Sequence, residues 1–216
     1  MRNFLISNIN LLANVSHIIL LTNIVLFFMG FTKNGKAHKI FAIYLLIIFI
    51  GEMTSEIMIY RKYENISMSH YYFILQFIFL SLFYLEILTV PIQKKIIKIG
   101  LIVVPIILSI QYLLNPKLIF IFNLFEVFVC SLSIVVYATF HFYNMLSQQK
   151  KYYYINIGIL IYLFGSTIIF LAGNVILTGH NQIGFLLYIT NITLYIIYLT
   201  LIFIEWLKNH YNKTEL

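Results

Sequence analysis

The sequence predicts an all-α fold: a polytopic membrane protein that forms a seven-transmembrane-helix bundle in one domain, residues 1–216. Of its residues, 62% are hydrophobic and 10% are charged, whereas soluble domains are about half apolar and about a quarter charged. Apolar segments of about 20 residues or more recur from Phe4 to Leu207, and this is the length that a bilayer requires of a helix. The polar joints between them are too short to fold as separate domains.

Four spans are predicted in the first half of the chain. The first, 4–30, shows no small-residue cleavage signal, so we interpret it as a retained helix and not as a signal peptide. The second, 39–60, follows the joint "TKNGKAHK", and the third, 70–90, follows "RKYENISMS". Such residues suit backbone that leaves the hydrocarbon. The fourth, 97–114, has Pro105 near its centre, which predicts a kink, and its apolar middle is expected to face lipid.

Three further spans complete the bundle. The fifth, 117–147, follows "NPK", the sixth, 153–177, follows "SQQKKY", and the seventh, 183–207, follows "TGHNQ". The sixth span contains Gly158 and Gly165. Small residues of this kind let neighbouring helix backbones approach closely, so we expect the sixth helix to pack tightly against a neighbour.

The basic residues predict the orientation of the bundle. One side of the membrane receives only Arg2, Arg61, Lys62 and Lys117. The positive-inside rule therefore predicts an N-terminus outside and a C-terminus in the cytoplasm, in a bacterial inner membrane. Scattered loop lysines do not form the continuous basic surface that nucleic-acid binding needs, so the predicted environment is the lipid bilayer. The other side receives Lys33, Lys36, Lys39, Lys94, Lys95, Lys98, Lys150, Lys151, Lys208 and Lys213.

Polar side chains fall at similar depths in several predicted spans. Glu52 and Glu56 lie one helical turn apart in the second span, where an ionised carboxylate costs about 2.5 to 3.5 kcal/mol. Such residues usually face a bundle interior or a watery cavity, so we expect one outward-facing polar pocket. The alternative is a proton-sharing pair that only joins helices by hydrogen bonds. The candidate ligand-binding residues are Glu52, Glu56, Gln76, Glu126, Asn191 and His17.

Absent motifs narrow the enzyme classes. The chain has no aspartate, no HExxH and no GxSxG, and its seventh span has no lysine between Ile183 and Leu207 for a retinal Schiff base. No second histidine stands near His141 at metal-ligand spacing, and Cys130 is the only cysteine. No catalytic residue, cofactor or metal ligand is therefore predicted. The question of enzymatic activity stays open and leans towards no.

Two long segments resemble a known group of proteins. They are "GEMTSEIMIYRKYENISMSHYYFILQFIFLSLFYLEIL" and "INIGILIYLFGSTIIFLAGNVIL". These runs resemble small seven-helix integral membrane proteins of Bacteroidetes without assigned function. The helix layout is also similar to the seven-helix sensor regions of bacterial histidine kinases. The resemblance implies a signalling role and recurring polar positions, which are here Glu52 or Glu56, Gln76, Glu126 and Asn191.

Three function classes follow from these observations. The first is a membrane-embedded sensor or accessory signalling protein, whose outward pocket binds an unknown small ligand or cation and which signals to a separate cytoplasmic or membrane partner. The alternative is a small-solute or proton-coupled transporter of 3+1+3 helix layout, because "FIGEM" and "LFGST" place Gly51 and Gly165 at similar depths. That layout is similar to the sugar-transporting SWEET proteins, although their repeat prolines are missing here. The second alternative is a membrane-embedded lipid-modifying enzyme.

Overall fold

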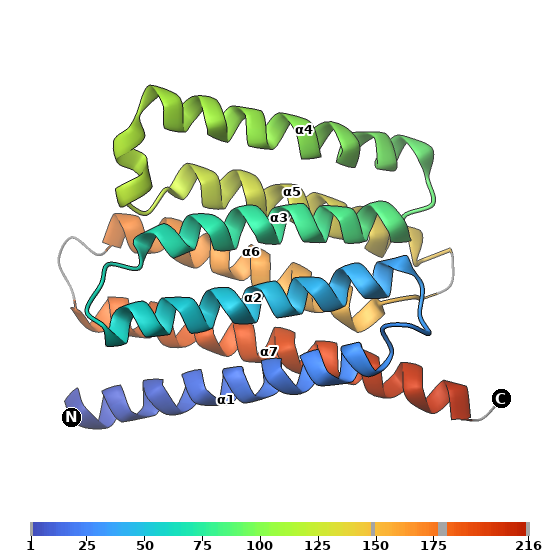
Figure 1. Cartoon of the computed structure of the whole chain (residues 1–216), viewed down its shortest axis with the longest axis horizontal. Helices are drawn as coiled ribbons and strands as arrows, with labels where there is room; N and C mark the ends of the chain where they lie inside the picture. Colours follow the sequence, from blue (N-terminus) through green and yellow to red (C-terminus); the bar gives the residue numbers. More distant parts are fainter. Residues whose placement is uncertain (1, 148–149, 177–180, 215–216) are drawn as a thin grey trace.

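The computed structural model describes residues 2–147, 150–176 and 181–214, with side chains for 11–147, 150–173 and 183–208. Its seven α-helices are long and apolar enough to cross a membrane, and no strand occurs in the part of the chain that is described (Figure 1). The prediction of an all-α, seven-helix membrane protein is confirmed. The elements are α1 (Arg2–Met29), α2 (Lys36–Tyr60), α3 (Ile66–Ile87), α4 (Pro91–Leu114), the 3₁₀ helix η1 (Pro116–Phe120), α5 (Leu124–Asn144), α6 (Tyr153–Ile176) and α7 (Asn181–Thr214).

The largest differences from the predicted helix starts are those of the fourth and fifth helices. The fourth helix begins at Pro91 and not at residue 97, because proline suits the first helical turn, where its missing N–H would be unpaired anyway. The fifth begins at Leu124 and not at residue 117, because Asn123 caps it: the Asn123 side-chain oxygen accepts a hydrogen bond from the Glu126 backbone N–H at 3.3 Å. The predicted end of the sixth span, residue 177, lies outside the described residues.

Six of the helices form a closed ring. Contacts run from α1 to α2, α2 to α3, α3 to α5, α5 to α6 and α6 to α7, and α7 packs back on α1. Two side-chain hydrogen bonds join α1 and α7, the pair that closes the ring. The Asn23 amide donates to the Leu199 carbonyl at 2.9 Å, and the Trp206 indole N–H donates to the Leu26 carbonyl at 3.0 Å. Hydrogen bonds of this kind hold helices together where the hydrophobic effect cannot.

The fourth helix lies outside the ring. It packs on α3 and α5 along one edge of the bundle (Figure 1), and it buries the smallest share of its span among the seven. Gln93 and Asn144 exchange reciprocal amide hydrogen bonds of 2.8 and 3.2 Å near one end of α4. The apolar middle carries Pro105 within a continuous helix. The expectation that this helix faces lipid therefore agrees with its exposed apolar surface.

Close packing of α6 on α7 depends on two glycines. A Cβ at Gly158 would lie 2.8 Å from the Tyr198 ring, and one at Gly165 would lie 2.7 Å from a Leu194 methyl group. Carbon atoms at such distances overlap, so a larger residue at either position would require the facing Tyr198 or Leu194 side chain to shift. The expected role of the two glycines as close-contact residues is confirmed.

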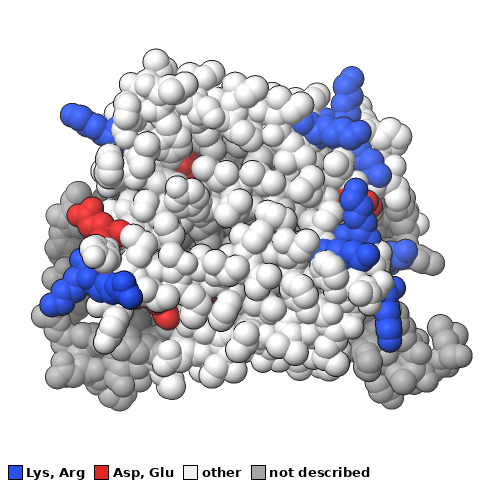
Figure 2. All heavy atoms as spheres, in the orientation of Figure 1, with Lys and Arg blue, Asp and Glu red and all other residues white. Residues whose placement is uncertain are grey.

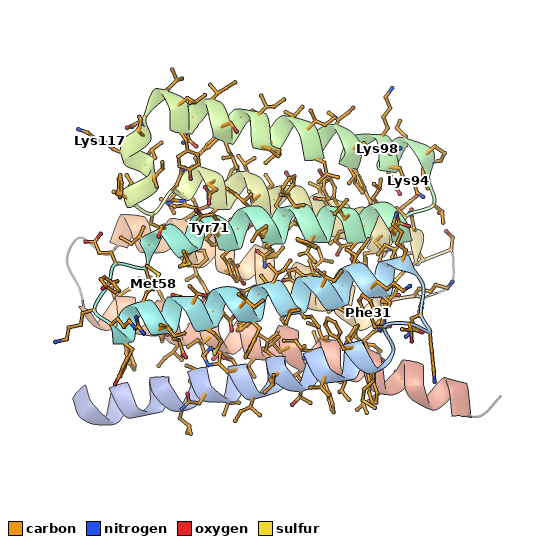
Figure 3. The ribbon with its side chains drawn as sticks, in the orientation of Figure 1. Phe31, Met58, Tyr71, Lys94, Lys98 and Lys117 are labelled. Carbon is orange, nitrogen blue, oxygen red and sulfur yellow. The ribbon has the colours of Figure 1, made fainter. Side chains whose placement is uncertain are left out.

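Basic side chains gather at one end of the bundle, which we call the lysine-rich end. Figure 2 shows most of the lysines at this end and fewer basic residues at the other. Figure 3 labels Lys94 and Lys98 at the lysine-rich end and Lys117 at the opposite end. The C-terminus lies at the lysine-rich end and the N-terminus at the opposite one (Figure 1). Helices α1, α3, α5 and α7 therefore run towards the lysine-rich end, and α2, α4 and α6 run away from it.

Candidate functional site

The first polar cluster joins α1 to the two acids of α2. The His17 Nε2 lies 3.5 Å from Glu52 Oε2, and its Nδ1 lies 3.5 Å from Glu56 Oε1. The side chains of His17 and Glu52 are each 18% exposed, whereas that of Glu56 is 52% exposed. An imidazole carries protons on both nitrogens only as the cation. A protonated His17 therefore has one N–H for each carboxylate, but its single positive charge balances only one of them.

The same cluster contains buried polar atoms without ordinary partners. Tyr195 of α7 neighbours Glu52, and Tyr188 lies near Glu56. Asn191 stands between these tyrosines on the same helix face. Within the described side chains, Glu52 Oε2, Asn191 Oδ1 and the Tyr195 hydroxyl make no hydrogen bond of normal geometry. Most buried polar atoms in proteins are paired, whereas Glu52 Oε2 has only the longer contact with His17 at 3.5 Å and the neighbouring Tyr195. The polar atoms of this region are therefore incompletely paired.

A tyrosine network fills the centre of the ring. The Gln76 amide donates to the Tyr44 hydroxyl at 3.2 Å and to the Tyr72 hydroxyl at 3.4 Å. Tyr72 pairs with the Tyr162 hydroxyl at 3.2 Å, and Tyr198 donates to Tyr44 at 3.3 Å. The rings of Tyr162 and Tyr198 stack with centroids 5.4 Å apart. Side chains from α2, α3, α6 and α7 are thus joined by hydroxyl contacts across the ring.

A second cluster lies between α3, α4 and α5. The Glu126 carboxylate lies 3.2 Å from His70 Nδ1 and accepts a hydrogen bond from the Tyr112 hydroxyl. The other nitrogen of His70 lies 3.2 Å from the Ile119 carbonyl oxygen, and the Asn123 amide donates to the Tyr112 hydroxyl at 3.2 Å. Glu126 is completely buried. In this second cluster the buried carboxylate therefore has hydrogen-bond partners from the protein itself.

The structure divides the predicted residues among three places. His17, Glu52 and Glu56 meet in the first cluster, with Asn191 nearby, and Gln76 belongs to the tyrosine network. Glu126 belongs to the second cluster, and α2 and α5 are not among the helix pairs in contact within the described residues. The described contacts place these residues in separate groups, and the expectation of one shared pocket stays a prediction. The ligand-binding role of each residue stays a prediction.

His70, Tyr112 and the central tyrosines were not selected from the sequence. Their partners lie on other helices, and an isolated tyrosine or histidine in an apolar span gives no pairing signal. His70 stands near the start of α3 and Tyr112 near the end of α4, so only the packing of these helices shows that both reach Glu126. Among the described residues, no three His, Cys, Asp or Glu side chains are placed to hold a metal ion.

One large cavity opens at the lysine-rich end. Its volume is about 1210 Å³, and its walls come from α1, α2, α3, α5 and α7 and from the α1–α2 and α5–α6 connections. His141 lines it, with Nε2 lying 2.9 Å from the Lys151 carbonyl oxygen. The Tyr84 ring lies 6.3 Å from the His141 ring, and the Tyr84 hydroxyl donates to the Asn156 side-chain oxygen at 2.8 Å. The cavity is therefore adjacent to the polar groups of the ring centre.

The fold and these clusters define an integral membrane protein with a polar interior. No protein-family model matches the chain, no curated protein sequence is similar to it, and no solved structure resembles it. The resemblance to small seven-helix proteins of Bacteroidetes therefore stays a prediction, and the family of this chain is left open.

Proposed function

We propose that the protein is a small proton-coupled transporter of a polar solute, with the first cluster as its coupling site. The ring supports this proposal because its contacts repeat in two halves. The contact between α1 and α2 corresponds to that between α5 and α6, and the contact between α2 and α3 to that between α6 and α7. The contact between α3 and α5 likewise corresponds to that between α7 and α1. Paired helices also run in the same direction. This arrangement is the one that a 3+1+3 transporter with a parallel repeat requires, with α4 as the single helix, and transporter sites commonly lie at such a repeat interface.

One observation carries the proposal: polar side chains follow one another through the ring from the first cluster to the cavity at the lysine-rich end, joined by hydrogen bonds at some steps and by ring packing at others. Glu52 neighbours Tyr195, whose ring lies 5.3 Å from that of Tyr162. From Tyr162 the hydroxyl contacts pass through Tyr72 and Gln76 to Tyr44. Tyr84 interacts electrostatically with Tyr44, and the centroid of its ring lies 6.3 Å from that of His141 on the cavity wall. A transporter needs polar groups along its whole path, whereas a purely structural pair does not.

We place the lysine-rich end in the cytoplasm of a bacterial inner membrane, which puts the first cluster in the outer half. Glu64 of the α2–α3 connection and Ser147 after α5 are exposed at opposite ends, and the native Cys130 is buried. In intact cells, a membrane-impermeant maleimide should label the Glu64→Cys variant and should label the Ser147→Cys variant only after lysis. The reverse pattern would invert the proposed orientation.

The transport activity is testable in proteoliposomes with a pH-sensitive dye in the lumen. An imposed membrane potential, applied with a mixture of small amines, sugars and amino acids outside, should drive proton entry and solute uptake measured by mass spectrometry. Glu52→Gln should remove both signals, whereas Glu64→Gln, a change in an exposed loop, should leave them intact. Absence of uptake and of proton entry in the intact protein would refute transport.

A second candidate is the sensor or accessory signalling protein. The packed tyrosine rings favour it, because a well-packed centre can carry a change at the first cluster to the lysine-rich end without passing any solute. A signalling partner would then bind at the cytoplasmic end. Purification from the native membrane should retain a stoichiometric signalling protein in this case, whereas a transporter should purify without one.

A further inference from the structure

The cavity at the lysine-rich end has an unbalanced charge. Its lining holds four lysines and a single glutamate: Lys33, Lys36, Lys150, Lys151 and Glu86. Lys36 Nζ lies 2.6 Å from Glu86 Oε1 and so compensates this glutamate. Within the described part of the chain, the other three lysines form no ion pair with a carboxylate. The positive charge that they carry is available to an anion.

Two helices begin at the wall of this cavity. The first turn of α2 starts at Lys36, and α6 starts directly after Tyr152. Helix N-termini present backbone N–H groups and a partial positive charge, which together favour anions. Gly35, the N-cap residue of α2, has no side chain to cap this helix. The backbone therefore adds to the attraction that the lysines exert.

The cavity wall is held in place by specific contacts. The His38 Nε2 lies 2.9 Å from the Phe27 carbonyl oxygen, and its ring stacks on Phe27 with centroids 4.8 Å apart. Tyr152 has a φ of 56°, a left-handed conformation that non-glycine residues rarely adopt, and its ring packs edge-on against Phe83 at 5.2 Å. Burial raises the pKa of Tyr152 to about 12, so this phenol stays protonated and offers a donor at neutral pH. Strained residues held by packing are common in binding sites.

We propose that the cavity at the lysine-rich end binds a phosphate-bearing anion, either a soluble phosphate compound or the headgroup of an anionic lipid. The volume of about 1210 Å³ exceeds the range of about 300 to 1,000 Å³ that is usual for small-ligand sites, so the cavity has room for more than a bare ion. Apolar wall residues such as Met29 and Trp206 suit the organic part of such a ligand. The proposal does not depend on transport, because the cavity can hold an anion whether or not a solute crosses the ring.

The test uses a lysine pair in the cavity and a matched pair outside it. Lys33→Gln with Lys151→Gln removes two lining charges, whereas Lys95→Gln with Lys98→Gln removes two exposed charges at the same end that do not line the cavity. Pyrophosphate binding to the purified protein is measured by calorimetry. Retention of phosphatidylglycerol over phosphatidylcholine is measured by native mass spectrometry. The cavity pair should weaken binding at least about tenfold and the outside pair less than about twofold.

A variant that is expected to bind the anion more tightly gives the more decisive test. Glu86→Gln removes the only negative charge of the lining and releases Lys36, so binding should become several-fold tighter. Lys33→Arg with Lys151→Arg keeps the charge and should keep the binding, which separates loss of charge from loss of fold. If the variants change only pyrophosphate binding, the ligand is a soluble phosphate compound. If they change only the retention of phosphatidylglycerol, the ligand is a lipid headgroup. No saturable binding in either arm, or equal losses for the two glutamine pairs, would overturn the proposal.

Discussion

The two histidine–glutamate clusters have similar chemistry but differ in how fully their polar atoms are paired. In the second cluster, Glu126 is completely buried, and its carboxylate lies at hydrogen-bonding distance from the Tyr112 hydroxyl and the His70 ring. In the first cluster, His17 lies 3.5 Å from each carboxylate, Glu56 is half exposed, and Glu52 retains a buried oxygen without an ordinary hydrogen bond. A closed cluster stabilises a fold, whereas an incompletely paired one can exchange a proton or a ligand. From this comparison we propose a structural role for Glu126 and a functional role for Glu52.

The largest effect is expected when the acceptor of the second cluster is removed. Glu126→Ala leaves the buried donors of His70 and Tyr112 without their shared acceptor, and each unpaired buried polar group costs about 1 to 3 kcal/mol. The free energy of unfolding, measured by reversible denaturation in mixed micelles, should fall by about 2 to 3 kcal/mol. Glu64→Ala, in an exposed connection, serves as the control. A Glu126→Ala protein as stable as the control would remove the structural role.

Glu52→Gln should give the opposite pattern. Glutamine keeps the shape of glutamate and can donate a hydrogen bond, but it cannot exchange a proton. Proton-driven uptake should fall at least tenfold, which corresponds to about 1.4 kcal/mol, while unfolding changes by less than about 0.5 kcal/mol. Glu126→Gln is the matched comparison. If it abolished uptake without loss of stability while Glu52→Gln did not, the assignments of the two clusters would be reversed.

Double-mutant cycles measure the pairing within each cluster directly. The cycle of His70→Ala and Glu126→Ala should give a coupling energy above about 1 kcal/mol, because the contact is buried and the residues share Tyr112. The cycle of His17→Ala and Glu52→Ala should give about 0.5 kcal/mol or less, because the contact is longer and partly exposed. Equal coupling energies would mean that the two clusters are paired to the same degree.

The smallest effect concerns the tyrosine network. Tyr44→Phe removes a hydroxyl that accepts from both Gln76 and Tyr198. Hydrogen bonds between membrane helices contribute about 0.6 kcal/mol on average, so the loss of stability should be of this size. Uptake should fall more than this stability loss explains, because the polar path is interrupted. Tyr60→Phe, at the exposed end of α2, should change neither quantity.

The sequence predicted the fold better than it predicted the site. Seven apolar segments followed directly from hydropathy, because each helix must satisfy its own backbone in lipid. The start of the fifth helix was wrong, since the capping by Asn123 was not recognised within a continuous apolar run. Glu52, Glu56 and His17 do meet, because acids in a span face the interior. The partners of Glu126 could not be predicted, since α4 brings Tyr112 from outside the ring.

The position of α4 also has a topological consequence. Neighbouring helices α3 and α5 run in the same direction, so a chain that leaves α3 at the lysine-rich end must cross the membrane once before α5 can begin. Each half has three helices, so the chain ends the first half on the opposite side of the membrane from where it began. One additional helix must bring it back, because otherwise the second half would be inverted in the membrane relative to the first. The helix α4 provides this crossing. Because it packs on the outer side of the ring, the interface between the two halves is formed by the other six helices.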